Sequence, residues 1–225
     1  MTTFSRFSAL SAVAAAAAAL LSPSVAEAAG GDFDTQPNLI ITAERLFGYS
    51  YSSTNLPGDS KSTDSNFSLL IPSGGAGSVY GGPSVGVHYP IIPQLTLGAQ
   101  LGLLYTSGTN KVGDVSKDKD STFGFLLAPR VGYILGINPG AYIWLRGGLS
   151  YFRSSTGGED DKDTVYSGLA VSIDPMVVIT PVNHFGITIG PTVDLPLTGS
   201  SKTGDTSVDV TTTQIGLQFG LLGYL

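Results

Sequence analysis

The sequence predicts an all-β fold: an antiparallel, up-and-down transmembrane β-barrel of eight strands that follows a cleaved N-terminal signal peptide. Three observations predict this fold. Long stretches alternate apolar residues with Gly, Thr and Ser, the few charged residues gather between those stretches, and the connections alternate between short and long. A period of two residues is typical of a β-strand whose two faces meet different surroundings.

The segment 184–197 shows the alternation most clearly. Its apolar side chains share one parity, and His, Gly, Thr and Asp share the other. The apolar set is Phe185, Ile187, Ile189, Val193, Leu195 and Leu197. The same pattern recurs in 141–151, 165–179 and 215–225. A strand with one apolar face and one small, polar face is what a membrane-spanning barrel requires, with the apolar face toward lipid.

The N-terminus indicates export. Arg6 gives a weakly basic start, an apolar run rich in Ala covers 9–21, and Ala26-Glu27-Ala28 is a small-residue cleavage site. We therefore expect a signal peptide at 1–28 that is cleaved near Ala28, a short periplasmic N-terminal segment at 29–38 and one barrel domain at 39–225. The apolar run is too short to favour a membrane anchor. The chain has no Cys, which excludes disulfides, thiol chemistry and a lipid-attachment Cys.

Charge is scarce and unevenly placed. Charged residues make up 12% of the chain, and the net charge of −6 argues against nucleic acid as a partner. Most charges fall in four segments that also carry Ser, Thr and Gly and that we interpret as long solvated loops: 52–82, 107–121, 155–163 and 198–209. A soluble barrel would place charges along its outer strand faces, which disfavours the alternative of a soluble periplasmic, lipocalin-like barrel with its apolar face inward.

In chain order, each expected strand is bounded by residues that are typical of turns or loops. The eight strands are expected near 40–51, 84–89, 95–106, 122–134, 141–154, 164–179, 184–197 and 210–225. Three connections, 90–93, 136–140 and 180–183, are short and contain Pro, Gly or Asn, and the other four are the long polar segments. Short turns on one side and long loops on the other are typical of bacterial outer-membrane barrels. Both termini then lie on the short-turn, periplasmic side.

Four residues conflict with an undisturbed barrel. Pro129, Pro175 and Pro191 fall inside expected strands on the lipid-facing parity, where each removes an N–H from the ladder, so we expect bulges there. Arg45 shares the parity of Phe47 and would face lipid, at a cost of about 2–4 kcal/mol near the midplane. Arg45 either lies near the periplasmic interface and snorkels, or the first strand is bulged.

Aromatic residues on the apolar parity form two bands. Those near the loop ends of their strands are Tyr49, Tyr51, Tyr105, Phe123, Phe125 and Tyr151, and those near the turn ends are Tyr89 and Tyr133. Two such bands are typical of the aromatic girdles at the two membrane interfaces.

The last expected strand resembles the C-terminal signal of outer-membrane barrel proteins. Apolar residues alternate from Ile215 to Leu221, and Tyr224 precedes Leu225 where that family usually ends in an aromatic residue. Over 39–225 the chain resembles the small eight-stranded bacterial outer-membrane β-barrel proteins of the outer membrane protein A transmembrane-domain type. The resemblance implies a Gram-negative outer-membrane monomer that contacts outer-membrane lipid and is recognised by the barrel-assembly machinery through its C-terminal strand.

The sequence shows no constellation that would carry catalysis. We expect no enzyme activity, no catalytic residues, no cofactor and no metal site. His88 and His184 are expected at the periplasmic rim as polar residues, because a metal site needs more convergent ligands than two His. The run from Glu159 to Asp163 lacks the regular spacing and the central Gly of a Ca²⁺ loop, so we expect a solvated charge run.

The interior parity also carries charge. Glu44, Arg130, Arg146 and Asp174 lie at similar distances from the periplasmic ends of their strands. We expect one lumen layer of two acids against two bases, because buried charges persist when they are paired; the alternative is that the four groups sit in lumen water. Further lumen-polar residues on this parity are Gln100, Gln218 and Asp194, and the two Gln are expected to complete the network.

Eight strands leave an interior that side chains fill, so a wide diffusion pore is not expected. The sequence favours a non-enzymatic outer-membrane barrel with a plugged polar lumen, which serves membrane structure and displays polar loops to surface partners. The alternatives are a small-ligand or lipid-handling barrel, which includes a carrier, a narrow channel or a lipid-modifying enzyme, and the soluble periplasmic barrel. A titratable cluster at the outer rim would favour the enzyme, and an apolar lumen would favour the carrier.

Overall fold

The computed structural model describes residue 33 and residues 38–58, 60–69, 82–112, 115–157 and 163–225. The expected signal peptide with its cleavage site near Ala28 and most of the acidic run from Glu159 to Asp163 lie outside the described residues. No helix within the described ranges is long and apolar enough to cross a membrane.

The described residues form one antiparallel sheet of ten strands. They are β1 (Ile40–Leu56), β2 (Ser60–Leu69), β3 (Ser84–Ile92), β4 (Leu95–Val112), β5 (Val115–Asn138), β6 (Ala141–Thr156), β7 (Thr164–Val182), β8 (Phe185–Thr203), β9 (Thr206–Asp209) and β10 (Thr211–Tyr224). Because β10 pairs with both β1 and β8, eight of these strands close into a ring, and only β2 and β9 lie outside it. The prediction of an eight-stranded antiparallel barrel is confirmed.

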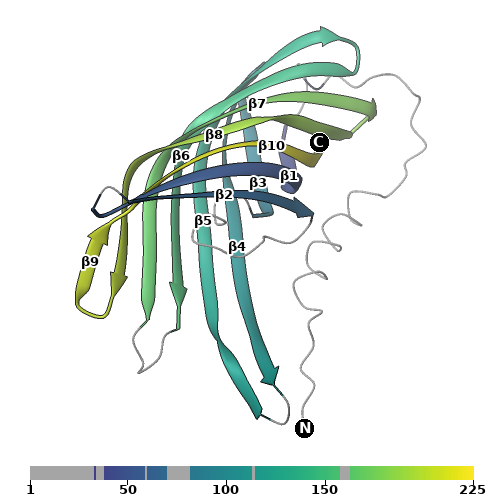
Figure 1. Ribbon diagram of the computed structural model, residues 1–225. Helices are drawn as coiled ribbons and strands as arrows, with labels where there is room; N and C mark the ends of the chain where they lie inside the picture. The colour runs from purple at the N-terminus through teal and green to yellow at the C-terminus, as the bar shows by residue number, and fades with distance from the viewer. Residues whose placement is uncertain (1–32, 34–37, 59, 70–81, 113–114, 158–162) are drawn as a thin grey trace.

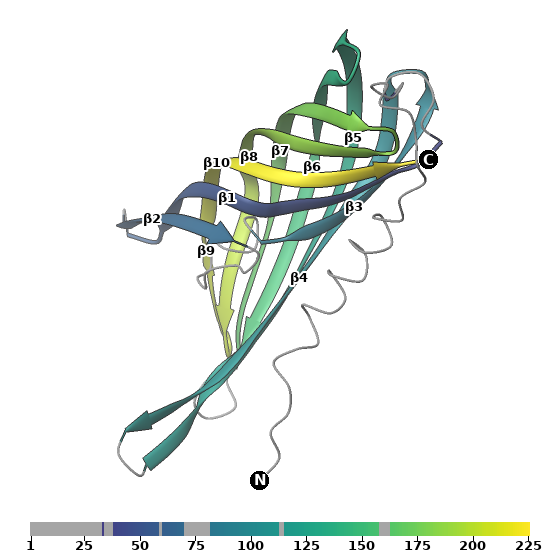
Figure 2. The ribbon, with the colours of Figure 1, turned by 90° about the vertical axis from the view of Figure 1, so that its right-hand side faces the viewer.

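The barrel has two unlike ends, which Figures 1 and 2 show from two sides. We call them the turn end, where the tight turns and the C-terminus lie, and the hairpin end, where the strands run on as long hairpins. The β4–β5 hairpin projects far beyond its neighbours (Figure 2). In the topology of outer-membrane barrels the turn end is periplasmic and the hairpin end faces outside.

Three tight turns close the turn end. They lie at 93–94, 139–140 and 183–184, and each contains a residue with positive φ: Gln94 at 74°, Gly140 at 84° and His184 at 65°. Two-residue hairpin loops need positive φ because their twist must match that of the strands. β3 continues through Pro90 to Ile92 before its turn, so this turn falls later than the sequence predicts.

At the hairpin end, three of the four expected long loops are largely strand. β4 and β5 stay paired out to Val112↔Val115, β2 pairs along the outer half of β1, and β9 pairs with the end of β8. Facing Thr hydroxyls also connect neighbouring barrel strands near this end, as in the 2.9 Å contact between Thr54 on β1 and Thr212 on β10. The loop interpretation of 52–82, 107–121 and 198–209 was therefore wrong for most of their described residues, because a strand with water on both faces has no apolar period of two.

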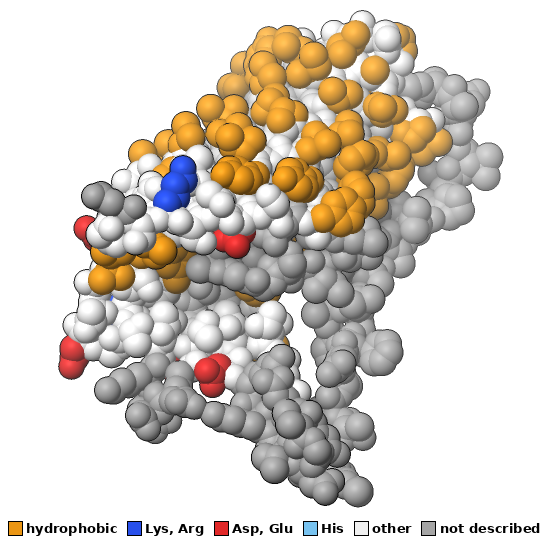
Figure 3. Space-filling model, viewed as in Figure 1, with side chains coloured by type: hydrophobic (Ala, Val, Ile, Leu, Met, Phe, Trp, Pro, Cys, Tyr) orange, Lys and Arg blue, Asp and Glu red, His pale blue; other side chains and the backbone are white. Residues whose placement is uncertain are grey.

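The predicted alternation separates the inside of the barrel from the outside. Along β8, Ile187 and Leu195 are exposed, whereas Gly190 and Asp194 between them are buried. Exposed apolar side chains cover the wall toward the turn end, coloured orange in Figure 3, and give way to polar ones toward the hairpins. Both expected aromatic bands point outward. An apolar belt of this extent is suited to lipid, and it opposes the inward apolar face of the soluble alternative.

The three strand prolines cause no bulge, contrary to the expectation. The ladder pairs on either side of Pro129 keep one register with β6, and those on either side of Pro175 and Pro191 keep one register between β7 and β8. Glycines on neighbouring strands accommodate two of the prolines. A Cβ on Gly148 would lie 2.0 Å from the carbonyl oxygen of Pro129, and one on Gly190 would lie 2.0 Å from that of Pro175. A proline can therefore stay in a barrel strand where the neighbouring strand has room for its carbonyl.

Candidate functional site: the barrel interior

A bulge in β1 turns Arg45 into the lumen. Ala43 pairs with Leu221 and Phe47 with Phe219, so the chain takes four steps along β1 against two along β10. Arg45 lies within these extra residues with a φ of 55°, and its side chain is buried. Of the two explanations offered for Arg45, the structure shows the bulge, and the guanidinium does not snorkel to the interface.

Glu44 and Arg146 form a buried bidentate ion pair. Arg146 Nη1 donates to Glu44 Oε1 at 2.6 Å, and Nη2 donates to Oε2 at 2.9 Å. The Gln100 amide donates to Oε2 at 2.7 Å, and the Thr42 hydroxyl donates to Oε1 at 2.6 Å. Glu44 is 3% exposed and Arg146 is 4% exposed. A carboxylate that receives a planar guanidinium and two neutral donors has the hydrogen bonds that a buried charge needs.

Arg130 and Asp174 form the second pair. Arg130 Nε donates to Asp174 Oδ2 at 3.0 Å, and Nη2 donates to the Ser150 hydroxyl at 2.9 Å. Arg130 Nη1 donates to the carbonyl oxygens of Leu149 at 2.7 Å and Pro129 at 3.2 Å. Leu149 stands opposite Pro129 in the β5–β6 register. The guanidinium therefore supplies a donor to the part of the ladder where proline has none.

Serine hydroxyls connect the second pair to a third. Ser150 Oγ lies 2.7 Å from Ser172 Oγ, and the Ser172 hydroxyl donates to Asp194. Asp194 Oδ2 lies 3.5 Å from Arg45 Nη2. We call the six charged residues the lumen layer: Glu44, Arg45, Arg130, Arg146, Asp174 and Asp194. It holds three acids and three bases, one of each more than the sequence predicted, and its formal charges cancel.

The two His residues do not come together. His88 was expected at the periplasmic rim, but it is 0% exposed in the lumen, where its Nε2 lies 3.8 Å from Glu44 Oε1 and its ring lies 4.8 Å from the Trp144 ring. Because β3 continues to Ile92, its turn comes several residues after His88, and His88 lies inside the lumen and not at the rim. His184 does lie in an exposed turn at the rim, where Nδ1 is 2.9 Å from the Tyr224 carbonyl oxygen.

Of the two Gln residues expected in the network, Gln100 reaches Glu44 and Gln218 does not reach any charged group in the described contacts. The Gln218 amide donates instead to Met176 Sδ at 3.6 Å. Gln218 and Gln214 line a small cavity beside the bulge, together with Arg45. Arg45 Nε and Nη1 are buried without a protein hydrogen-bond partner among the described residues.

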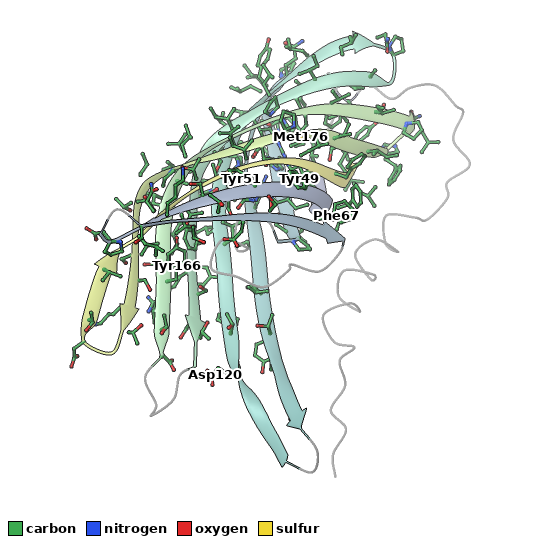
Figure 4. All side chains as sticks on the ribbon, viewed as in Figure 1. Tyr49, Tyr51, Phe67, Asp120, Tyr166 and Met176 are labelled. Atoms are coloured by element: carbon green, nitrogen blue, oxygen red, sulfur yellow. The ribbon has the colours of Figure 1, made fainter. Side chains whose placement is uncertain are left out.

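Apolar side chains fill the lumen on both sides of the lumen layer. The turn-end cluster consists of Phe33, Ile40, Ile134, Tyr142, Trp144, Met176, Val178, Leu222 and Tyr224. The hairpin-end cluster consists of Leu104, Leu126, Ala128, Phe152, Tyr166, Ala170 and Val210. Figure 4 labels Met176 and Tyr166, which mark the two levels. Neither cluster was predicted from the sequence, although Tyr142 and Trp144 share the parity of Arg146 on β6 and could have indicated the first.

Interior glycines make room for these rings. A Cβ on Gly132 would lie 2.4 Å from Trp144 Nε1, and a Cβ on Gly168 would lie 2.6 Å from the Phe152 ring. Trp144 Nε1 donates to the Thr96 hydroxyl at 3.1 Å, which satisfies the one polar atom of the indole. The abundant interior Gly therefore lies beside large side chains and does not leave the lumen empty.

No metal centre is visible in the described part of the chain, where no three His, Cys, Asp or Glu side chains converge. Asp163, the described residue of the acidic run, accepts a hydrogen bond from the Ser155 hydroxyl at 3.2 Å. The ionisable groups that the structure does gather lie within the barrel, in the lumen layer and not at the hairpin end.

Comparisons with known proteins agree with this architecture. No protein-family model matches the sequence, and no curated protein matches it. Among solved structures, Neisserial surface protein A is 11% identical and aligns with a TM-score of 0.50 over 84% of this chain and 97% of its own. The outer membrane protein OprG from Pseudomonas aeruginosa is 9% identical, with a TM-score of 0.48 over 85% of this chain and 98% of its own. The N-terminal β-barrel domain of OprF from the same organism is 10% identical, with a TM-score of 0.41 over 82% and 98%. At 11% identity the likeness to Neisserial surface protein A concerns the fold alone, and together with the closed ring it shows that this chain has the fold of a small eight-stranded β-barrel.

Proposed function

We propose that this protein is a non-enzymatic β-barrel of the bacterial outer membrane, exported with a signal peptide that is cleaved near Ala28. Its lumen is plugged, it acts as a monomer that contributes to membrane structure, and it displays its polar hairpins for contacts outside the cell. The barrel-assembly machinery would receive it through β10.

The observation that supports this proposal is the presence of buried side chains at three successive levels of the barrel interior. These levels are the turn-end cluster, the lumen layer and the hairpin-end cluster. In the middle level, every acid of the lumen layer has an Arg within 3.5 Å. A lumen closed by paired charges and packed rings offers no wide path to ions or nutrients.

The absence of enzyme activity is part of the proposal and has its own support. General acid–base chemistry needs a titratable group within reach of a substrate. In the described residues the gathered carboxylates are buried and engaged with guanidinium groups, and a substrate outside the barrel would not reach them.

Conductance of the purified monomer in a planar lipid bilayer tests the plugged lumen. We expect only small and infrequent openings, because side chains occupy all three levels. The matched variant is Arg146→Ala, which removes the largest side chain from the ion pair with Glu44 and should raise the frequency of openings. Large, stable conductance from the unmodified barrel would contradict the proposal.

A second candidate, a carrier for a small apolar ligand, is favoured by the hairpin-end cluster, because the sequence analysis expected a small and polar lumen wall there. Titration calorimetry with hexanol at fixed detergent concentration distinguishes the two functions. A saturable heat that disappears in a Leu126→Trp variant, in which a larger side chain would take any space a ligand could use at this level, favours the carrier. Heat that only follows partition into the detergent favours the plugged structural barrel.

A further inference from the structure

Phe33 precedes the barrel in sequence but lies inside it. Its side chain is 0% exposed and belongs to the turn-end cluster. Its backbone N–H donates to the hydroxyl of Tyr142 at 3.4 Å. Phe33 belongs to the segment 29–38, which the sequence predicts to be a short periplasmic segment. A large apolar side chain enters the lumen because burial removes it from water.

The Phe33 ring meets three aromatic walls in the same geometry. Its centroid lies 5.4 Å from that of Tyr142, 5.8 Å from Trp144 and 5.3 Å from Tyr224, with interplanar angles of 65°, 76° and 67°. All three are edge-to-face contacts, the arrangement that ring quadrupoles favour. β6 provides two of the walls and β10 provides the third, so the site exists only when the barrel is closed.

The lumen layer closes this aromatic site on the side of the hairpins. The Arg146 guanidinium lies 4.7 Å from the centroid of the Trp144 ring, and the His88 ring lies 4.8 Å from it. Arg146 is in turn held by Glu44. A ligand would therefore reach the aromatic walls from the turn end, which is the end where β1 begins.

The chain next to Phe33 is anchored at the same end. Asn38 and Leu39 both donate backbone hydrogen bonds to the Leu225 carbonyl, and the Leu225 N–H donates to the Leu39 carbonyl at 3.0 Å. Four residues separate Phe33 from Asn38, so Phe33 cannot move far from the mouth of the barrel. A tethered ring of this kind has a high effective concentration at a site that it can reach.

We propose that the turn end of the lumen is a binding site for a single aromatic ring, and that the chain fills it in cis with Phe33 as a plug that closes the periplasmic mouth. The ligand class is a phenyl ring next to a peptide amide, because the Tyr142 hydroxyl accepts the Phe33 N–H beside the three ring contacts. This site goes beyond the proposed function. The lumen layer keeps the barrel closed to ions whether or not the ring is bound, so the conductance experiment and the ring-binding experiment test the two proposals separately.

The fluorescence of Trp144 tests the plug, because the chain contains one Trp and this Trp forms a wall of the site. The experiment uses the mature protein in lipid vesicles with three versions: unmodified, Phe33→Ala, and the control Phe123→Ala, which removes an exposed ring near the hairpin end. We expect Phe33→Ala to shift Trp144 emission to longer wavelength and to increase its quenching by acrylamide. The control should change neither. Unchanged emission in Phe33→Ala would overturn the proposal.

Rescue in trans separates a binding site from mere packing. N-acetyl-phenylalanine amide added to the Phe33→Ala barrel should return Trp144 emission toward that of the unmodified protein, and N-acetyl-leucine amide should not. A shifted emission that neither amide reverts, or that both revert equally, would overturn the binding site. Should Phe33→Ala fail to fold, Phe33→Leu keeps apolar bulk in the lumen and is expected to show the same selective rescue. Failure of the phenylalanine amide in folded Phe33→Leu would count equally against the site.

Discussion

At the scale of single residues, the lumen layer is stable because each buried charge has a partner and neutral donors around it. The Glu44 carboxylate illustrates this arrangement, since it accepts from Arg146, Gln100 and Thr42. Removing one member of such a group leaves the others buried without compensation, which costs more than the pair itself contributes. Single substitutions should therefore destabilise the barrel more than paired ones.

Replacing Arg146 with Ala is the direct test of this coupling. The variant leaves the Glu44 carboxylate buried without its guanidinium, and we expect a loss of about 3–5 kcal/mol in the free energy of unfolding, less where water enters the lumen. Urea unfolding of the barrel in lipid vesicles, followed by Trp144 fluorescence, measures the loss. Arg153→Ala is the matched control, because Arg153 lies on the same strand with an exposed side chain.

The double variant Glu44→Gln with Arg146→Met extends this test. It removes both charges and keeps side chains of similar volume, so we expect it to be more stable than Arg146→Ala alone. An Arg146→Ala barrel that unfolds at the same urea concentration as the unmodified protein would show that lumen water screens Glu44.

Parity and position along the strands sufficed to predict Glu44, Arg130, Arg146 and Asp174 as lumen residues. They could not place Arg45, because a bulge with positive φ reverses the face of a side chain without any signal in the apolar pattern. Gln100 and Gln218 also follow the predicted parity, but sequence alone does not say which partner an interior amide reaches.

At the scale of strands, the fit between neighbours depends on interior glycines. Gly132 faces Trp144 and Thr96, and a Cβ there would lie 2.4 Å from the indole nitrogen and 2.5 Å from the Thr96 hydroxyl oxygen. Strand positions ordinarily tolerate Ala at least as well as Gly. A position where Ala lowers the stability of the barrel is therefore one where close packing inside the lumen requires Gly.

We accordingly expect Gly132→Ala to lower the free energy of unfolding by about 1–3 kcal/mol through overpacking. The control is Gly147→Ala, because a Cβ there would meet the Ser172 carbonyl oxygen at 3.4 Å, which is ordinary contact. Urea unfolding of both variants in lipid vesicles measures the difference. Equal stability of the two variants would show that Trp144 can move aside at no cost.

The sequence predicted the eight barrel strands but not their length beyond the membrane. Inside the apolar belt the two faces meet different surroundings, and the period of two is visible, as on β8. In the β4–β5 hairpin, residues such as Thr109 and Asp118 pair across the ladder where the sequence indicated a loop. Both faces of this hairpin carry polar residues, so its sequence has no apolar period of two from which a strand could be predicted.

At the scale of the whole molecule, the unlike ends of the barrel determine which segments a protease can reach. A protease added to intact cells should cut near the β4–β5 hairpin tip at 112–115 or within 155–163, and should spare the β3–β4 turn around Pro93. Mass spectrometry of the fragments checks the sites. Cleavage that appears only after the outer membrane is opened would show that the hairpin end does not face outside.

Ring closure was predictable, because an even number of strands with alternating long and short connections leaves few topologies. The packing of the lumen was less predictable. The turn-end cluster joins Phe33 to strands from both halves of the sequence, and such contacts follow only from the closed ring. The prediction that small and polar residues line the interior holds for most interior positions. It did not include the large aromatic rings of the two clusters, such as Trp144 and Phe152.

The first and last strands of the barrel, β1 and β10, pair with each other and close the ring. Leu39 and Leu225 exchange backbone hydrogen bonds beside this β1–β10 seam. Until both strands are in place, each leaves a row of unpaired N–H and C=O groups that lipid does not solvate. The seam should therefore form late and together with insertion. Since Leu39 lies beside Leu225, a linker from the end of β10 to the start of β1, with a cut at the β4–β5 tip, would produce a circular permutant of the barrel with the same ladder. Its assembly would reveal whether the order of strands along the chain matters once the ring can close.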